Sequence, residues 1–154
     1  MEYYETELWN KNRGHMKLIV WQKAIQLFEL VWKIPFIEVK IDLKLRSQLA
    51  DAVQSISANI SPGYGRRSIN EYIQFLYYAL GSLAETMTRA IGLKQTKQIY
   101  AGRFHEFDPL HYEVENWRLG LIDKLEQKRE DDDWIARIAE DPEEYITTPL
   151  LQRS

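Results

Sequence analysis

Residues 57–68 read SANISPGYGRRS, and this stretch joins the two best-patterned segments of the chain. Gly63 and Gly65 can adopt positive φ, which is the usual way for a helix to end. Ser68 and Glu71 have the spacing of a capping box, in which a serine caps a new helix and an acid follows three residues later. The stretch therefore predicts two long helices joined by a tight turn.

The helix before this turn is expected from Asp42, as its cap, to about Gly63. Opposite its core-facing stripe the side chains are small, which suits either a second helix contact or solvent. Pro62 lacks a backbone donor, so the last turn is expected to be kinked or unwound. The core-facing side chains are Leu45, Leu49, Ala52, Val53, Ile56 and Ile60, and the small face consists of Ser47, Ala50, Gln54, Ala58 and Ser61.

The helix after the turn is expected from Ile69 to about Gln98. Tyr78 points away from its apolar stripe and is flanked by Gly81, Ser82 and Glu85. An interior glycine costs a helix ~1 kcal/mol relative to alanine, so Gly81 indicates close packing on this outer face. The alternative is a tolerated glycine beside an exposed tyrosine. The expected core stripe is Ile69, Tyr72, Ile73, Leu76, Leu80, Leu83, Met87, Ala90 and Ile91.

Two further helices complete the pattern. Apolar residues spaced by three or four predict a helix over about residues 17–33, and residues 36–41 are expected to form a loop. Asp108 as cap and Pro109 at the first helical position predict a fourth helix that ends near Arg129, with Phe107 stapled onto Tyr112. The fold class is therefore all-α, an up-and-down antiparallel four-helix bundle. The two stripes of the first helix are Leu18, Trp21, Ile25, Phe28 and Trp32, and Val20, Ala24, Leu27 and Val31.

The 154 residues suffice for one domain, and the composition, 45% apolar and 28% charged, is typical of a globular protein. No apolar run approaches the ~20 residues of a membrane span, and the sequence starts with acidic residues, so a cytoplasmic protein is expected. Residues 130–154 carry eight acids and two bases, which leaves the remainder of the chain mildly basic. We therefore divide the chain into an N-terminal arm (residues 1–16), the bundle (17–129) and an acidic C-terminal extension (130–154).

Three motifs resemble the bacterial four helix bundle protein family, also called the 23S rRNA intervening-sequence proteins. They are VWQKA at residues 20–24, the stretch at 57–68, and ALGSL at 79–83 with Glu85 close behind. The resemblance covers about residues 16–128. It implies an up-and-down bundle that assembles into a ring-like homopentamer, with no established catalysis.

The chain departs from that family at two places. Asn-Ile-Ala-Glu-Gly is replaced by NISPG at residues 59–63, which removes an acid before the turn, and the acidic stretch after Gly-Ser-Leu is reduced to residues 84–86. A more remote analogy is a retroelement protein that assists a reverse transcriptase and binds nucleic acid.

Tyr64, Arg66 and Arg67 are the candidate contacts to nucleic acid or another anion. Two guanidinium groups beside a turn and a helix N-terminus suit a phosphate, and the tyrosine ring suits stacking on an unpaired base. The alternative is structural, with Arg67 paired to Glu71 or to an acid of a neighbouring subunit and Tyr64 packed over the turn. The acidic extension could also occupy this basic surface as an internal competitor.

A second set of residues is expected to serve assembly or helix register. Asn59 lies at the border of the core stripe, where a buried amide normally finds a partner on an adjacent helix. The complete set is Asn59, Gly63, Glu71, Tyr78, Gly81, Ser82 and Glu85.

No catalytic, metal or cofactor site is expected. The three histidines, His15, His105 and His111, lack the spacing of a metal motif, and the sequence has no cysteine, phosphate loop or nucleophile elbow. The leading hypothesis is a non-enzymatic homo-oligomeric bundle, without a membrane partner or an identified small-molecule substrate. The alternative is an accessory protein that binds RNA or DNA.

Overall fold

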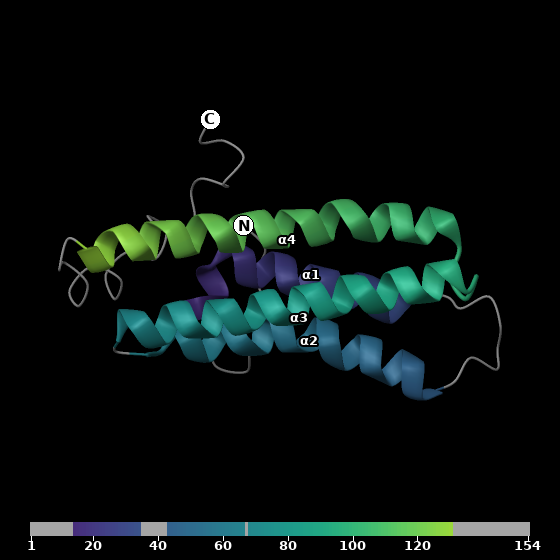
Figure 1. Cartoon of the computed structure of the whole chain (residues 1–154), viewed down its shortest axis with the longest axis horizontal. Helices are drawn as coiled ribbons and strands as arrows, with labels where there is room; N and C mark the ends of the chain where they lie inside the picture. The colour runs from purple at the N-terminus through teal and green to yellow at the C-terminus, as the bar shows by residue number, and fades with distance from the viewer. Residues whose placement is uncertain (1–13, 35–42, 67, 131–154) are drawn as a thin grey trace.

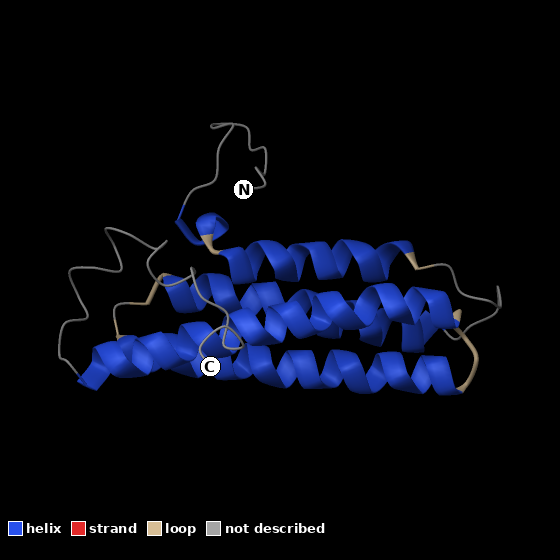
Figure 2. Ribbon diagram, turned by 90° about the horizontal axis from the view of Figure 1, so that it is seen from above, coloured by secondary structure: helices blue, strands red, loops and turns tan. Residues whose placement is uncertain are grey.

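The computed structural model describes residues 14–34, 43–66 and 68–130. A short 3-10 helix, η1 (Gly14–Lys17), precedes four α-helices: α1 (Ile19–Lys33), α2 (Leu43–Tyr64), α3 (Ile69–Gln95) and α4 (Ala101–Glu130). The four helices lie side by side, and helices that follow one another run in opposite directions (Figure 1). The described part of the chain contains no strand (Figure 2), and the all-α four-helix bundle is confirmed.

Several expectations fall outside the described residues. They are most of the N-terminal arm, the loop at residues 36–41, Arg67 and nearly all of the acidic extension. The division into arm, bundle and extension therefore stays a prediction.

The helices enclose a single core. α1 contacts α2 and α4, and α3 likewise contacts α2 and α4, so each helix has two neighbours in a square arrangement. Heptad-like spacing brings Val20, Ala24, Leu27 and Val31 of α1 into this core, where each is at most 6% exposed. On α3 the buried seam follows Leu76, Ala79, Leu83, Thr86, Ala90 and Leu93.

Three residues expected in the core are exposed. Trp32 and Leu45 lie near the ends of α1 and α2, where fewer neighbouring helices cover them, and they are 64% and 46% exposed. Ile91 is 42% exposed because the seam of α3 passes through Ala90 and Leu93, to either side of it.

The expected end of this helix near Gly63 is confirmed to within one residue, since α2 ends at Tyr64, but Pro62 lies inside the helix and not in an unwound last turn. Gly14 is the single described glycine with positive φ, so Gly63 and Gly65 do not end the helix in a left-handed conformation. Backbone bonds from Gly65 N to Ser61 O (3.4 Å) and from Arg66 N to Gly63 O (3.1 Å) end it instead.

The cap at the start of α3 is confirmed, since Ser68 Oγ accepts a hydrogen bond from Glu71 N at 3.5 Å. α3 ends slightly earlier than expected, at Gln95. Lys97 adopts a left-handed φ of 58°, and Gln98 N donates to Leu93 O at 2.8 Å, which is the geometry of a Schellman-type helix end.

The expected start of α4 at Pro109 is also wrong, because the helix begins at Ala101 and carries Pro109 inside it. Phe107 is 1% exposed and packs against Phe104 and His111, with ring centroids 5.8 and 5.5 Å away, whereas its expected partner Tyr112 is exposed. Burial of this aromatic cluster offsets the ~3 kcal/mol that an interior proline costs a helix.

Candidate functional site

The turn between α2 and α3 places its candidate contact residues at one end of the bundle. Tyr64 is half-buried and packs edge-on against Tyr72, with ring centroids 6.3 Å apart. Burial raises the pKa of the Tyr64 hydroxyl. Its ring also lies 3.6 Å from where a side chain on Gly14 would begin. Tyr64 therefore packs against Tyr72 of α3, and its contact with nucleic acid stays a prediction.

Arg66 is exposed, and its guanidinium lies over the ring of Phe75, 4.9 Å from the centroid. A cation–π contact of this kind contributes about 0.5–1 kcal/mol at an exposed site and leaves the guanidinium open to solvent. Of the predicted trio, the structure thus presents Arg66 as an exposed cation, while Arg67 lies outside the described residues.

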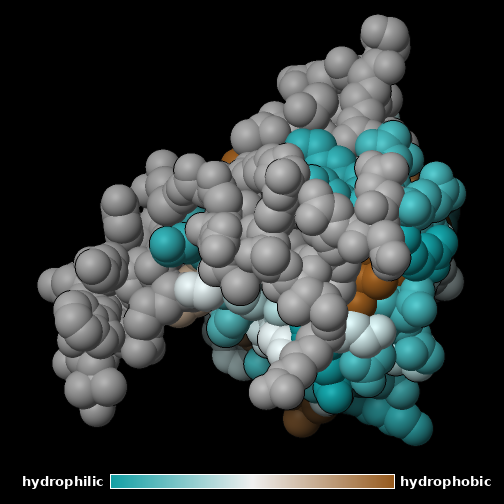
Figure 3. Space-filling model, turned by 90° about the vertical axis from the view of Figure 1, so that its left-hand side faces the viewer, coloured by the Kyte–Doolittle hydropathy of each residue, from teal (hydrophilic) through white to brown (hydrophobic). Residues whose placement is uncertain are grey.

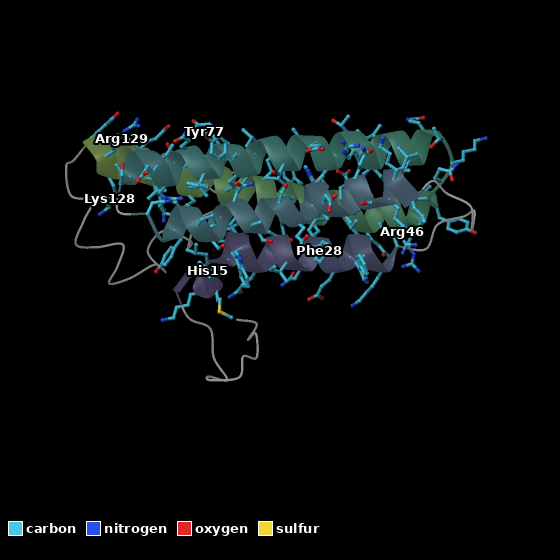
Figure 4. All side chains as sticks on the ribbon, turned by 90° about the horizontal axis from the view of Figure 1, so that it is seen from below. His15, Phe28, Arg46, Tyr77, Lys128 and Arg129 are labelled. Carbon is cyan, nitrogen blue, oxygen red and sulfur yellow. The ribbon has the colours of Figure 1, made fainter. Side chains whose placement is uncertain are left out.

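Further positive charge gathers at this end of the bundle. Figure 4 shows Lys128 and Arg129, from the last turn of α4, at the same end as His15. Arg129 donates to Asn70 Oδ1 at 3.2 Å, which ties the end of α4 to the start of α3. In Figure 3 the described residues visible at this end are predominantly hydrophilic. Because Glu71, in the first turn of α3, and Glu130, at the end of α4, lie here as well, this end has mixed charge.

α2 and α3 approach closely at Gly63. A Cβ placed on it would lie 2.8 Å from Phe75 Cβ and 3.0 Å from Tyr72 Cδ2. Burial, with a smaller contribution from Tyr64, raises the pKa of the Tyr72 hydroxyl far above its ordinary value. Within the chain, α2 and α3 approach closely at Gly63, whereas nothing lies within 4 Å of a Cβ on Gly81. Close packing at Gly81 against another subunit stays a prediction.

The remaining assembly residues form an outward-facing patch on α3. Tyr78 is 50% exposed and accepts a hydrogen bond from Gln74 at 2.7 Å. Ser82 accepts a hydrogen bond from Ser55 of α2 at 2.7 Å, and Glu85 pairs with Arg89 at 2.9 Å. We call Tyr77, Tyr78, Gly81, Ser82 and Glu85 the α3 outer face.

Asn59 binds within its own helix, because its amide donates to Ser55 O at 2.8 Å. A role in register between subunits stays a prediction. Glu71, from the same predicted set, is exposed and contributes its backbone N–H to the Ser68 cap.

A hollow of about 440 Å³ lies between α1 and the first half of α2. Its lining includes the apolar side chains of Phe28, Val31 and Leu49 together with Trp32 and Arg46. Figure 4 labels Phe28 and Arg46 toward the end of the bundle opposite Lys128. Leu43, which also lines this hollow, is 77% exposed. Exposed apolar side chains around a concavity are typical of a protein contact surface.

The sequence reasoning missed two buried polar residues of α4. His111 is 4% exposed, and its Nε2 donates to Leu83 O of α3 at 2.8 Å. Arg118 is fully buried, and none of its three guanidinium nitrogens has a hydrogen-bond partner among the described residues. The spacing of four and three residues from Phe107 through His111, Val114, Arg118 and Leu121 to Leu125 is the signal that would have found them.

Arg118 is a charged side chain in the core. Burial lowers the pKa of its guanidinium to about 10, partly offset by the negative charge of Glu115 and by Tyr77. At neutral pH the group is still protonated, so the core contains a positive charge that no described residue pairs through a hydrogen bond. Leaving a buried charge uncompensated typically costs several kcal/mol.

The described residues bring no group of three or more histidine and acidic side chains together in a metal-binding arrangement. His105 is exposed and His111 is buried, so they do not share a site. Among the helices that the structure describes, none combines the length and apolar character needed to cross a membrane.

Comparison with known proteins agrees with the fold. A search of curated proteins finds no match to this chain. The family model described as 23S rRNA-intervening sequence protein matches residues 16–117, which include α1, α2, α3 and the first half of α4. The match contains every residue of the turn and of the α3 outer face. The chain therefore belongs to the 23S rRNA-intervening sequence protein family.

Proposed function

We propose that the protein is a non-enzymatic bundle that assembles head to tail with copies of itself into a closed ring, five subunits being the number that the family resemblance implies. The observation that supports this proposal is that the bundle presents two unlike exposed surfaces. The hollow between α1 and α2 is concave and apolar, and the α3 outer face carries two half-exposed tyrosines, Tyr77 and Tyr78.

The two surfaces lie on different sides of the same molecule, because α3 is not in contact with α1 in the square arrangement. A contact between two different patches is heterologous, and it generates a ring when the rotation between subunits closes. Tyrosine and tryptophan are enriched at such contacts because they bury a large area at little conformational cost.

Arginine substitutions at two exposed glycines test this proposal. Gly81 on the α3 outer face and Gly102 at the start of α4 are both exposed, and nothing lies within 4 Å of the Cβ that a substitution would add to either. Arginine favours a helix by up to ~1 kcal/mol over glycine, so loss of assembly would not come from unfolding. We expect Gly81→Arg to dissociate the oligomer in light scattering and Gly102→Arg to leave it intact. An unchanged mass for Gly81→Arg would contradict the proposed surface.

A second candidate function is binding of single-stranded RNA or DNA at the end of the bundle that holds Arg66. The supporting observation is the exposed Arg66, which lies just before α3, whose first turn is joined to the end of α4 by the hydrogen bond from Arg129 to Asn70. In this proposal the contact is made by cations through phosphate groups, with Tyr64 supporting the turn.

Phosphate contacts make affinity fall steeply with salt. Fluorescence anisotropy with a labelled single-stranded oligonucleotide should show binding at low salt that weakens in the Arg66→Ala/Arg67→Ala double variant. Arg103→Ala is the matched control, because Arg103 pairs with Glu106 near the opposite end of the bundle. Equal binding by the double variant and the unmodified protein would remove this candidate.

A further inference from the structure

We propose that one end of the bundle binds the surface of an anionic phospholipid membrane, with its cations on the headgroups and its exposed apolar side chains inserted among the lipids. This end lies opposite the turn between α2 and α3 (Figure 1). The inference goes beyond the proposed function and depends neither on assembly nor on nucleic-acid binding.

The termini of all four helices form this surface. α1 ends at Lys33 and α2 begins at Leu43, while α3 ends at Gln95 and α4 begins at Ala101. Because helices that follow one another run in opposite directions, these four termini lie together (Figure 1). We call residues 32–34, 43–47 and 91–106 the far end. Figure 4 shows Arg46 on this side of the molecule, opposite Lys128.

The far end is strongly basic. Glu106 is the one acid among its described residues, and it pairs with Arg103 at 3.2 Å. Residues 35–42, which join α1 to α2 in the sequence, add one base and two acids. The net charge is therefore positive with or without them. The cations of the far end are all exposed, and they are Lys33, Lys44, Arg46, Lys94, Lys97 and Arg103.

The same residues expose large apolar side chains. Leu43 is 77% exposed and Trp32 is 64% exposed. Basic and apolar residues also alternate along the chain, since Trp32 precedes Lys33 and residues 43–46 read LKLR. An exposed apolar patch among charged side chains marks an interaction site. Five of the eight large apolar side chains that are exposed on the described residues lie here, namely Trp32, Leu43, Leu45, Ile91 and Tyr100.

This combination fits an anionic membrane surface. Lysine and arginine are attracted to anionic headgroups, and tryptophan and tyrosine favour the level of the headgroups. The aliphatic residues favour lipid over nucleic acid. Leu43 and Leu45 cannot stack on a base as an aromatic ring does, but they leave water when they enter the outer acyl region.

The sequence analysis expects no membrane partner, because no apolar run is long enough to span a bilayer. A surface contact of this kind needs no such run. It is made by side chains at the end of a folded bundle, which reach only the headgroups and the adjacent acyl region.

Co-sedimentation of the full-length chain with vesicles tests the role of charge. We expect binding to vesicles of phosphatidylcholine and phosphatidylglycerol in equal parts, and much weaker binding to phosphatidylcholine alone. Lys33→Gln/Lys97→Gln should weaken binding to the mixed vesicles about ten-fold or more, because it removes two cations from the contact. No binding to the mixed vesicles, or equal binding to both kinds, would overturn the proposal.

The matched control removes the same charge from the opposite end of the bundle. Lys17 lies in η1 and Lys128 in the last turn of α4. Lys17→Gln/Lys128→Gln should weaken binding to the mixed vesicles less than about two-fold, because neither side chain reaches the lipid. A loss equal to that of Lys33→Gln/Lys97→Gln would show that net charge alone matters, and would contradict the far end as the contact.

A second pair of variants tests the insertion of apolar side chains. Leu45 and Tyr100 do not line the hollow between α1 and α2, so their replacement leaves the proposed subunit contact in place. Leu45→Ser/Tyr100→Ser should weaken binding to the mixed vesicles about five-fold or more. Tyr112→Ser is the control, since Tyr112 is 51% exposed but lies in α4 beyond the far end. Unchanged binding by Leu45→Ser/Tyr100→Ser would overturn the insertion.

A labelled single-stranded oligonucleotide separates a lipid surface from a nucleic acid. Its fluorescence anisotropy should be the same with Lys33→Gln/Lys97→Gln as with the unmodified protein. If this variant instead loses oligonucleotide binding while the unmodified protein ignores the mixed vesicles, the far end binds nucleic acid and the proposal is wrong.

Discussion

Gly63 of α2 and Phe75 of α3 approach so closely that a Cβ on the glycine would lie 2.8 Å from the Cβ of the phenylalanine. This contact explains why glycine is tolerated inside a helix, where it would otherwise be unfavourable. The next residue of α2, Tyr64, also packs against α3, through the ring of Tyr72.

Replacing this glycine should destabilise the protein. We expect Gly63→Ala to lower the free energy of unfolding by about 1–3 kcal/mol, because overpacking outweighs the gain in helix propensity. Gly81→Ala is the matched control, since its side chain meets open space and should raise the free energy of unfolding of the dissociated chain by up to ~1 kcal/mol. Urea unfolding measures whether each substitution raises or lowers the free energy of unfolding. A Gly63→Ala variant that is more stable than the unmodified protein would contradict the close contact.

Pro109 offers a direct test of where α4 begins. In the structure it is interior to the helix, so Pro109→Ala should restore a backbone donor, relieve the crowded carbonyl of His105, and raise the free energy of unfolding by about 1–3 kcal/mol. If the helix instead began at Pro109, the proline would be favourable there and its replacement would be neutral or destabilising. Thermal and urea unfolding of the variant distinguish the two.

The buried hydroxyl of Tyr72 predicts a loss of stability at alkaline pH. Burial raises its pKa in the folded protein, whereas the unfolded chain releases this proton near pH ~10. Above that pH the unfolded state binds fewer protons than the folded state, so the free energy of unfolding falls as the pH rises. Tyr72→Phe removes this contribution.

The measurement compares the unmodified protein with Tyr72→Phe at several pH values above 10. The difference between their free energies of unfolding should change by about 1.4 kcal/mol per pH unit in favour of the variant. Parallel pH profiles would show that Tyr72 ionises normally in the folded protein.

The fold was predictable because its signals are local. The serine cap at Ser68 and the stripe of α1 through Val20 and Leu27 depend on residues close in sequence, and both are confirmed. The role of Gly63 was not predictable, because a glycine can serve either a turn or a close contact. Which of the two applies depends on the residues of another helix, here Phe75.

The polar core of α4 was missed for a different reason. A search for apolar spacing passes over Arg118 and His111, although both fit the four-and-three spacing of the buried stripe. That spacing also continues back to Phe107, and it would have moved the start of the helix ahead of Pro109. The candidate contact at Tyr64 was only partly predictable, because its packing partner Tyr72 becomes evident once α2 and α3 are placed together.

Self-association is the central claim, and the mass of the unmodified protein in solution tests it most directly. One chain has a mass of 18.3 kDa, so a five-membered ring would have five times that mass. We predict that size-exclusion chromatography with light scattering at micromolar concentration gives a single species at about five times the chain mass. A species at the mass of one chain would contradict the account.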